Sequence, residues 1–345
     1  YSAFSVSDGR AYTLGHENGT ETVWCLDAEN GSELWSHTYP GELNDNLHTG
    51  GPAASPTIAG NRVYTLGKAG QLFCFDAAEG KVLWQHNLTE LLQVPVPEWG
   101  FACSPTLVDN KLIIDAGRVV ALNAETGDLI WRTDPFRAGY GSPVPFTHQG
   151  QTLLAVLNND ALLVLRLSDG EIVARTPWTS DFVTTATTPI VDGNRIFVST
   201  GYNTGCALFE LADGKLNQLY RNRDMSNHMN NCVLWQGHLY GFDGNSHNAR
   251  TVRLVCMDAN TGDVKWSQRG LGCGSLMLAG GKLIALSDEG RLVVLAASPQ
   301  GYEVLAEQEV LDPTCWTMPV LSGGRIYCRN DAGDAVCVDV RPEGK

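Results

Sequence analysis

The chain has no apolar run that approaches the roughly 18 residues of a transmembrane helix, so we expect no membrane span. It is also poor in basic residues, with 24 Lys and Arg against 38 Asp and Glu and a formal net charge of -14. Binding to nucleic-acid phosphates depends on clustered cations, and no basic run occurs. We therefore expect no nucleic-acid partner. The first residues, YSAFSVSDGRAYTLG, are typical of a β-strand rather than of a signal peptide.

One ten-residue phrase occurs four times in the chain. It stands at 26–35, 75–84, 122–131 and 257–266 as LDAENGSELW, FDAAEGKVLW, LNAETGDLIW and MDANTGDVKW. In each copy an Ala lies seven residues and a Gly four residues before a Trp. The phrase belongs to a unit of about 40 to 50 residues, which predicts a repeat architecture.

Each unit has the pattern of four short antiparallel strands. In residues 55–84, for example, Gly60-Asn61 and 68–70 form turns between apolar strands, and 82–84 form a fourth strand. Such units are typical of propeller blades, so we predict an all-β, eight-bladed β-propeller in one domain over 1–345. The last blade has only three strands. The predicted blades open near Phe4, Ala53, Ala102, Ser142, Thr187, Asn231, Gly274 and Thr317.

The phrase has a structural role in this architecture. Its Gly occupies the turn between the third and fourth strands, where a positive φ is cheap only for Gly. Its Trp then follows on the outer strand, where a large ring fills the wedge between neighbouring blades. We predict this docking role for Trp35, Trp84, Trp131 and Trp266. Blades four, five and seven lack the Trp and need other fillers.

The ten cysteines do not predict a disulfide framework. Cys25, Cys74, Cys256 and Cys337 occupy the same slot of four different repeats, too far apart to bridge, so we interpret them as small buried residues. Cys328 differs, because counting back from the turn at 332–333 places it opposite Cys337. A cross-strand disulfide there is an open alternative.

The phrase closely resembles the tryptophan-docking repeat of the PQQ-like β-propeller superfamily, and the resemblance extends over the whole chain. In detail the chain looks most like secreted bacterial PQQ-binding-like repeat proteins. The resemblance implies an eight-bladed ring, export across the inner membrane, and one of two branches. These branches are the quinoprotein dehydrogenases and non-catalytic scaffold propellers. A shared repeat specifies a fold more strongly than a chemistry.

The dehydrogenase branch uses adjacent cysteines against the quinone, calcium ligands beside it, and often a C-x-x-C-H haem segment. This sequence contains no Cys-Cys, no C-x-x-C and no C-x-x-C-H, which disfavours PQQ with calcium as a cofactor. We therefore predict a periplasmic or secreted binding or scaffold propeller without catalysis of its own. Its partner would be a small molecule, a carbohydrate or an envelope protein. The alternatives are a PQQ-dependent alcohol or sugar dehydrogenase and a carbohydrate-active enzyme.

The expected site lies on the loops that join one blade's outer strand to the next blade's inner strand, because these loops converge beside the central channel. We predict that its residues are Asp45, His48, Trp99, Tyr140, Asn227, His228 and Trp316. No metal site is predicted, because His48 and His228 belong to opposite blades. Cys103, Cys273 and Cys315 have similar offsets in three blades; we interpret them as small inner-strand residues, with a soft-metal site as the alternative.

Overall fold

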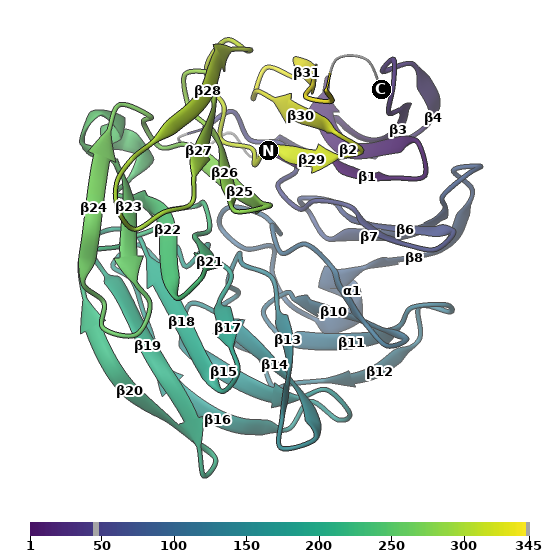
Figure 1. Ribbon diagram of the computed structural model, residues 1–345. Helices are drawn as coiled ribbons and strands as arrows, with labels where there is room; N and C mark the ends of the chain where they lie inside the picture. The colour runs from purple at the N-terminus through teal and green to yellow at the C-terminus, as the bar shows by residue number, and fades with distance from the viewer. Residues whose placement is uncertain (44–47, 343–345) are drawn as a thin grey trace. The chain divides into compact units, whose positions relative to one another are not determined.

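The computed structural model describes residues 1–43 and 48–342 and contains eight antiparallel sheets of consecutive strands (Figure 1). Within these residues seven sheets have four strands and the last has three. This confirms the predicted all-β, eight-bladed β-propeller with an incomplete last blade. The chain divides into two compact units, 1–143 with three blades and 144–345 with five. A single domain over 1–345 stays a prediction.

Unit 1 contains three blades and one short helix. Its strands are β1 (Ser5–Ser7), β2 (Arg10–Glu17), β3 (Thr20–Asp27), β4 (Glu33–Pro40), β5 (Thr57–Ala59), β6 (Arg62–Leu66), β7 (Gln71–Asp76), β8 (Val82–Asn87), β9 (Thr106–Val108), β10 (Lys111–Asp115), β11 (Val119–Asn123) and β12 (Leu129–Arg132). Helix α1 (Leu88–Leu92) follows β8 and is capped by the Asn87 side chain, which accepts a hydrogen bond from the Thr89 N–H. The short inner strands β1, β5 and β9 are neighbours.

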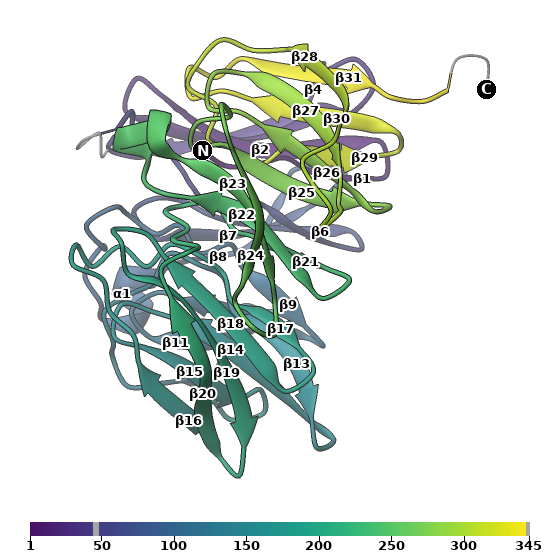
Figure 2. The same ribbon diagram turned by 60° about the vertical axis from the view of Figure 1, so that its left-hand side comes forward.

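Unit 2 contains the other five blades, and Figure 2 shows how the sheets β13–β16 and β17–β20 lie side by side. Its strands are β13 (Val144–His148), β14 (Gln151–Leu157), β15 (Ala161–Arg166), β16 (Ile172–Pro177), β17 (Ile190–Asp192), β18 (Arg195–Thr200), β19 (Gly205–Ala212), β20 (Lys215–Asn222), β21 (Val233–Trp235), β22 (His238–Asp243), β23 (Arg253–Asp258), β24 (Val264–Arg269), β25 (Ser275–Ala279), β26 (Lys282–Leu286), β27 (Arg291–Ala296), β28 (Val304–Glu309), β29 (Val320–Ser322), β30 (Arg325–Arg329) and β31 (Ala335–Asp339). A 3-10 helix, η1 (Ser246–Thr251), precedes β23. Within the described residues, no helix has the length and apolar character needed to cross a membrane.

The repeated phrase forms the turn between the third and fourth strands. In the second blade the Asp76 carboxylate accepts hydrogen bonds from the backbone N–H groups of Ala78 and Glu79. Asp27, Asn123 and Asp258 make the same bonds in their blades. The Gly that follows has a positive φ, +69° at Gly80, as the sequence predicts. The polar residue and the Gly therefore set this turn locally.

The docking Trp of one blade contacts the same phrase in the next blade. Trp35 Nε1 donates a hydrogen bond to the Ala77 carbonyl at 3.0 Å, and the Tyr12 hydroxyl donates to that oxygen at 2.9 Å. A Cβ on Gly80 would lie only 2.5 Å from the Trp35 ring. Gly80 is therefore required for two reasons: the turn needs a positive φ, and a side chain at this position would clash with Trp35 of the preceding blade.

The same contact recurs in both units. Trp84 Nε1 donates to the Ala124 carbonyl at 3.1 Å, and Trp266 Nε1 donates to the Ser298 carbonyl at 2.8 Å. Trp131 is 8% exposed. These bonds join neighbouring blades, because the indole of one sheet satisfies a backbone acceptor of the next.

Other residues fill the wedges where the Trp is missing. In the fourth blade Trp178, just after β16, is 1% exposed and donates from Nε1 to Thr200 Oγ1 at 2.8 Å. In the fifth blade Tyr220 on β20 donates to the Ala259 carbonyl at 3.1 Å and lies against Gly262. Tyr220 thus takes the place of the docking Trp in the fifth blade, whereas Trp178 fills space between the fourth and fifth blades beyond the end of β16.

The cross-strand disulfide between Cys328 and Cys337 does not form, and the pairing inferred for it is wrong by one residue. Cys328 lies opposite Val336, and Cys337 lies opposite Tyr327. A shift of one residue points two side chains to opposite faces of a sheet. All ten cysteines are free, and Cys337 is exposed where the other nine are buried. The interpretation of Cys337 as a buried residue is therefore also wrong, because β31 has no fourth strand over it among the described residues.

This difference in exposure predicts a selective thiol reaction. Native protein treated with a maleimide at pH 8 should take up one label, at Cys337, and unfolded protein should take up ten. Mass spectrometry of the labelled chain counts the adducts, and Cys337→Ser should leave none in the native state. Rapid labelling of two or more native thiols would contradict the burial of the other nine.

Candidate binding face

The predicted site residues lie on segments that lead into inner strands. His48 precedes β5, Trp99 lies between α1 and β9, and Tyr140 lies between β12 and β13. Asn227 and His228 lie between β20 and β21, and Trp316 lies between β28 and β29. Asp45 lies outside the described residues. Neighbouring strands of a blade run in opposite directions. The segments that lead into inner strands therefore lie at the same end of their sheets as the turns between second and third strands. The candidate face consists of these segments and these turns.

In unit 1 the structure brings His48, Trp99 and Tyr140 together. The rings of His48 and Trp99 are 5.4 Å apart between centroids, and Tyr1 lies edge-on to His48 at 5.7 Å. His48 Nδ1 accepts a hydrogen bond from the Gly50 N–H at 2.7 Å. Burial raises the pKa of Tyr140 to about 12, although a hydrogen bond from the Trp99 backbone lowers it. The Tyr140 phenol therefore stays protonated beside the Trp99 segment.

Two buried ionisable side chains, Glu21 and Lys68, lie against this group, and sequence reasoning missed them. The Glu21 carboxylate is 1% exposed and accepts hydrogen bonds from the Lys68 backbone N–H at 3.1 and 3.2 Å and from the Tyr39 hydroxyl at 2.8 Å. Burial lowers the pKa of Lys68 to about 8 and raises that of Glu21. A Cβ on Gly100 would lie 2.2 Å from Lys68 Cγ. Lys68 stands in an ordinary Gly-rich turn, GKAG, so no sequence signal marked it.

In unit 2 the site is built around a residue that the sequence did not single out, Tyr202. Its ring lies 4.9 Å from His228 at 90°, 6.0 Å from His247 at 18°, and 4.5 Å from Phe182 at 54°. We call these four residues the Tyr202 cluster. They come from the β16–β17, β18–β19, β20–β21 and β22–β23 connections. Trp316 is half-buried on the last blade and is not among them.

His228 is held as a neutral imidazole. Its Nδ1 accepts a hydrogen bond from the Ser246 N–H at 3.2 Å, so the ring proton lies on Nε2. Burial, helped by the nearby His247, lowers the pKa of His228 to about 4. His228 therefore presents a neutral N–H donor at physiological pH.

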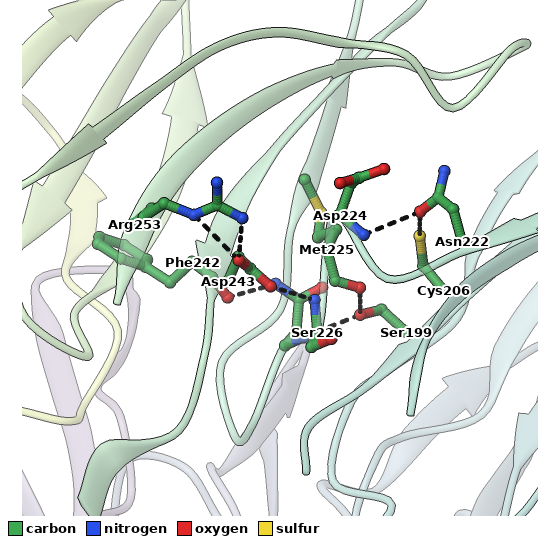
Figure 3. A network of polar contacts seen from close by, with 10 residues as sticks. Ser199, Cys206, Asn222, Asp224, Met225, Ser226, Phe242, Asp243 and Arg253 are labelled. Carbon is green, nitrogen blue, oxygen red and sulfur yellow. Dashed lines mark hydrogen bonds and ion pairs between the residues drawn. The ribbon is translucent and has the colours of Figure 1, made fainter. Parts of the chain in front are cut away.

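A network of hydrogen bonds fixes the segment that carries His228 (Figure 3). The Asn227 N–H donates to Ser199 Oγ at 2.9 Å, and Asn227 Nδ2 donates to the Phe242 carbonyl at 2.9 Å. The Ser226 N–H donates to Asp243 Oδ1. The other carboxylate oxygen, Asp243 Oδ2, accepts a hydrogen bond from Arg253 at 2.6 Å. Asn227 is 1% exposed. In this structure its side chain holds the segment in place, and its role in ligand contact stays a prediction.

The pKa of His228 predicts a loss of stability in acid. In the unfolded chain His228 takes up a proton near pH 6.5, and in the folded chain only near pH 4. The contribution of neutral His228 to the free energy of unfolding is therefore fully present above pH 6.5 and is lost as the pH falls through this window. The loss is at most about 3 kcal/mol, from 1.36 kcal/mol per pKa unit. Urea unfolding from pH 7 to 4 measures it. His228→Gln should lack this part of the loss, whereas His238→Gln, outside the cluster, should keep it; equal profiles would contradict the assignment.

The thiols of the face are not reactive groups. Burial raises the pKa of Cys103, Cys273 and Cys315 to about 12, 12 and 11. Over residues 1–43 and 48–342, no three His, Cys, Asp or Glu side chains are grouped to hold a metal ion. The sequence also contains no adjacent cysteines.

Structural comparisons agree with this architecture. The chain is similar to BamB from Moraxella catarrhalis, with a TM-score of 0.70 and 13% identity over 97% of this chain and 95% of that one. It is also similar to a europium-containing methanol dehydrogenase (TM-score 0.68, 12% identity, 97% and 81% covered). A third similar structure is the quinohemoprotein alcohol dehydrogenase from Comamonas testosteroni, with a TM-score of 0.66 and 15% identity over 94% of this chain and 69% of that one. At these identities the likeness shows the fold alone. No curated protein matches the chain in sequence.

The blades and their docking contacts are those of a PQQ-like β-propeller. The family model described as outer membrane protein assembly factor BamB matches residues 19–268, so the chain belongs to this family.

Proposed function

We propose that this chain is a periplasmic or secreted binding propeller, which holds a ligand or an envelope protein on its loop face and has no catalysis of its own. The observation that carries the proposal is the chemistry of that face. The loop segments offer aromatic rings and neutral hydrogen-bonding groups, Trp99 and Tyr140 in unit 1 and Tyr202 and His228 in unit 2. Hydrogen bonds to the backbone hold the segment that carries His228 in place. Rigid rings with a few placed polar groups suit binding.

The ionisable groups support binding rather than catalysis. General acid–base chemistry works best with a pKa near the operating pH. Burial moves the pKa of His228 down to about 4 and that of Tyr140 up to about 12, so both stay neutral. Lys68 has a pKa of about 8, but it is 3% exposed and its stem lies against Gly100, so a substrate does not reach it.

The comparisons support the scaffold branch of the superfamily. The matching family model names an assembly factor of the outer membrane, and the BamB structure is covered over 95% of its length. The two dehydrogenases are covered over 81% and 69%. An envelope location and an envelope protein as partner follow from this likeness as part of the proposal.

Two measurements test this function. Purified protein mixed with PQQ and calcium should show no quinone-dependent dye reduction with alcohols or sugars. Turnover by bound quinone would overturn the proposal in favour of the dehydrogenase alternative. Separately, fractionation of cells that produce the natural protein should recover it from the envelope or the medium, and recovery from the cytoplasm would contradict the proposed location.

A further inference from the structure

Phe182 is unusual among the exposed apolar side chains. It lies between β16 and β17 and is 61% exposed, whereas the other large hydrophobic residues exposed in the described parts of the chain are aliphatic or Met and 38–47% exposed. Most of these others lie on outer strands, such as Leu219 on β20 at 45%. Singly exposed apolar side chains are normal on a protein surface, so Phe182 stands out by its high exposure, its aromatic ring and its place on the loop face.

The backbone holds Phe182 in this position at some cost. Val183 has a φ of +52°, a region that a β-branched residue rarely adopts. The turn is kept by hydrogen bonds to Ser180 from the N–H groups of Val183, at 3.3 Å, and Thr184, at 3.0 Å. The Thr185 N–H donates to Asn159 Oδ1 at 2.8 Å, which ties the segment to the β14–β15 turn. Strain of this kind is concentrated at functional sites.

The other rings of the Tyr202 cluster support Phe182 from one side. Tyr202 packs against Phe182 at 4.5 Å and is itself contacted by His228 and His247. Tyr202 also has a positive φ, +53°, and its N–H donates to Asn245 Oδ1 at 2.8 Å. Tyr202 is half-buried among these neighbours, so Phe182 and the exposed His247 are the rings that a ligand can reach most easily.

Two polar side chains of the cluster are uncharged, whereas the exposed Asp181 precedes Phe182 in the chain. His228 presents a neutral Nε2–H donor because its Nδ1 accepts from Ser246. Burial raises the pKa of Tyr202, so its hydroxyl stays protonated and can both donate and accept. The cluster contains no carboxylate, ammonium or guanidinium group. Phe182, Tyr202 and His228 therefore supply no counter-charge to an anionic or cationic ligand.

We propose that the Tyr202 cluster binds a neutral saccharide, with Phe182 stacked on the apolar C–H face of one sugar ring. A pyranose has an apolar face and a rim of hydroxyl groups. It therefore needs a flat exposed ring with neutral donors and acceptors at the edge, which Phe182, Tyr202 and His228 supply. This inference rests on the proposed binding function and names the ligand class of that face.

The test uses the whole chain and three neutral probes: maltohexaose, cellohexaose and chitohexaose. Saturation-transfer NMR should show that at least one of them binds, and isothermal titration calorimetry then gives its Kd. Phe182→Ala should weaken that binding about tenfold or more, because the stacking ring is lost. Phe182→Tyr should restore it. Leu219→Ala, an exposed apolar residue on the same blade, is the matched control and should bind as the wild type does.

Two results would overturn the inference: no binding of any of the three probes, or equal affinity for wild type and Phe182→Ala. Retention of a purified envelope protein that depends on Phe182, without saccharide binding, would also overturn the saccharide assignment. None of these results affects the proposed absence of catalysis, which the quinone and dye measurement decides separately. Circular dichroism of each variant checks that the fold is kept.

Discussion

Replacing Gly290 with alanine should cost about 4 kcal/mol of stability, one of the two largest effects expected for this protein. Gly290 ends the β26–β27 turn with a φ of +93°, and a Cβ there would lie 1.8 Å from the Leu311 carbonyl oxygen. The Gly290 carbonyl also accepts hydrogen bonds from the N–H groups of Val310, at 3.0 Å, and Leu311, at 3.3 Å. Relieving the clash requires these bonds to lengthen or break.

Gly333 provides the matched control for this prediction. It has the same place in the β30–β31 turn and a φ of +100°, but nothing lies within 4 Å of its Cβ position. Gly333→Ala therefore carries only the backbone strain, about 1 to 2 kcal/mol. Urea unfolding followed by circular dichroism compares the two variants. Equal midpoints would mean that the segment after β28 moves away freely.

Replacing Trp178 with alanine should destabilise the protein by about 3 to 5 kcal/mol. The side chain is 1% exposed, its Nε1 donates to Thr200 Oγ1, and the Arg221 guanidinium lies 4.6 Å from the ring centroid. The substitution leaves a cavity between the fourth and fifth blades and removes the hydrogen-bond donor from a buried hydroxyl.

Two further variants separate these contributions. Thr200→Val removes only the hydrogen bond and should cost about 1 kcal/mol. Trp84→Ala removes a docking Trp that is only half-buried and should cost less than Trp178→Ala. Urea midpoints from circular dichroism rank the three variants. A Trp178→Ala protein as stable as wild type would show that this wedge collapses without loss.

The blade pattern was predictable because its causes are local. The turn depends on a polar residue and a Gly within five positions, as Asp76 and Gly80 show, and the strands depend on short-range apolar patterning. Each predicted blade opening lies within four residues of an inner strand, from Phe4 against Ser5 to Thr317 against Val320. The one register error, at Cys328 and Cys337, arose in a five-residue turn, whose centre is ambiguous by one position in the sequence.

The contacts on the candidate face were predictable in part. The sequence indicated the segments that bear His48, Trp99, Tyr140 and His228, because these are the variable connections between regular blades. It did not identify Tyr202, which stands in a short turn after β18 with no repeated signal. It also did not identify Trp178 as a wedge filler, because that Trp follows its strand instead of standing at the docking position.

The sequence by itself determined the repeat, the number of blades, the turn residues and the docking Trp of four blades, since these follow from propensities within a few residues. Only the tertiary structure decided which loop residues meet. His48 and Trp99 are 51 positions apart, and Tyr202, His228 and His247 come from separate connections. Their contacts depend on how neighbouring blades pack and on hydrogen bonds such as that from Ser246 to His228, which no local pattern encodes. The protonation of His228 follows from that packing as well, because burial sets it.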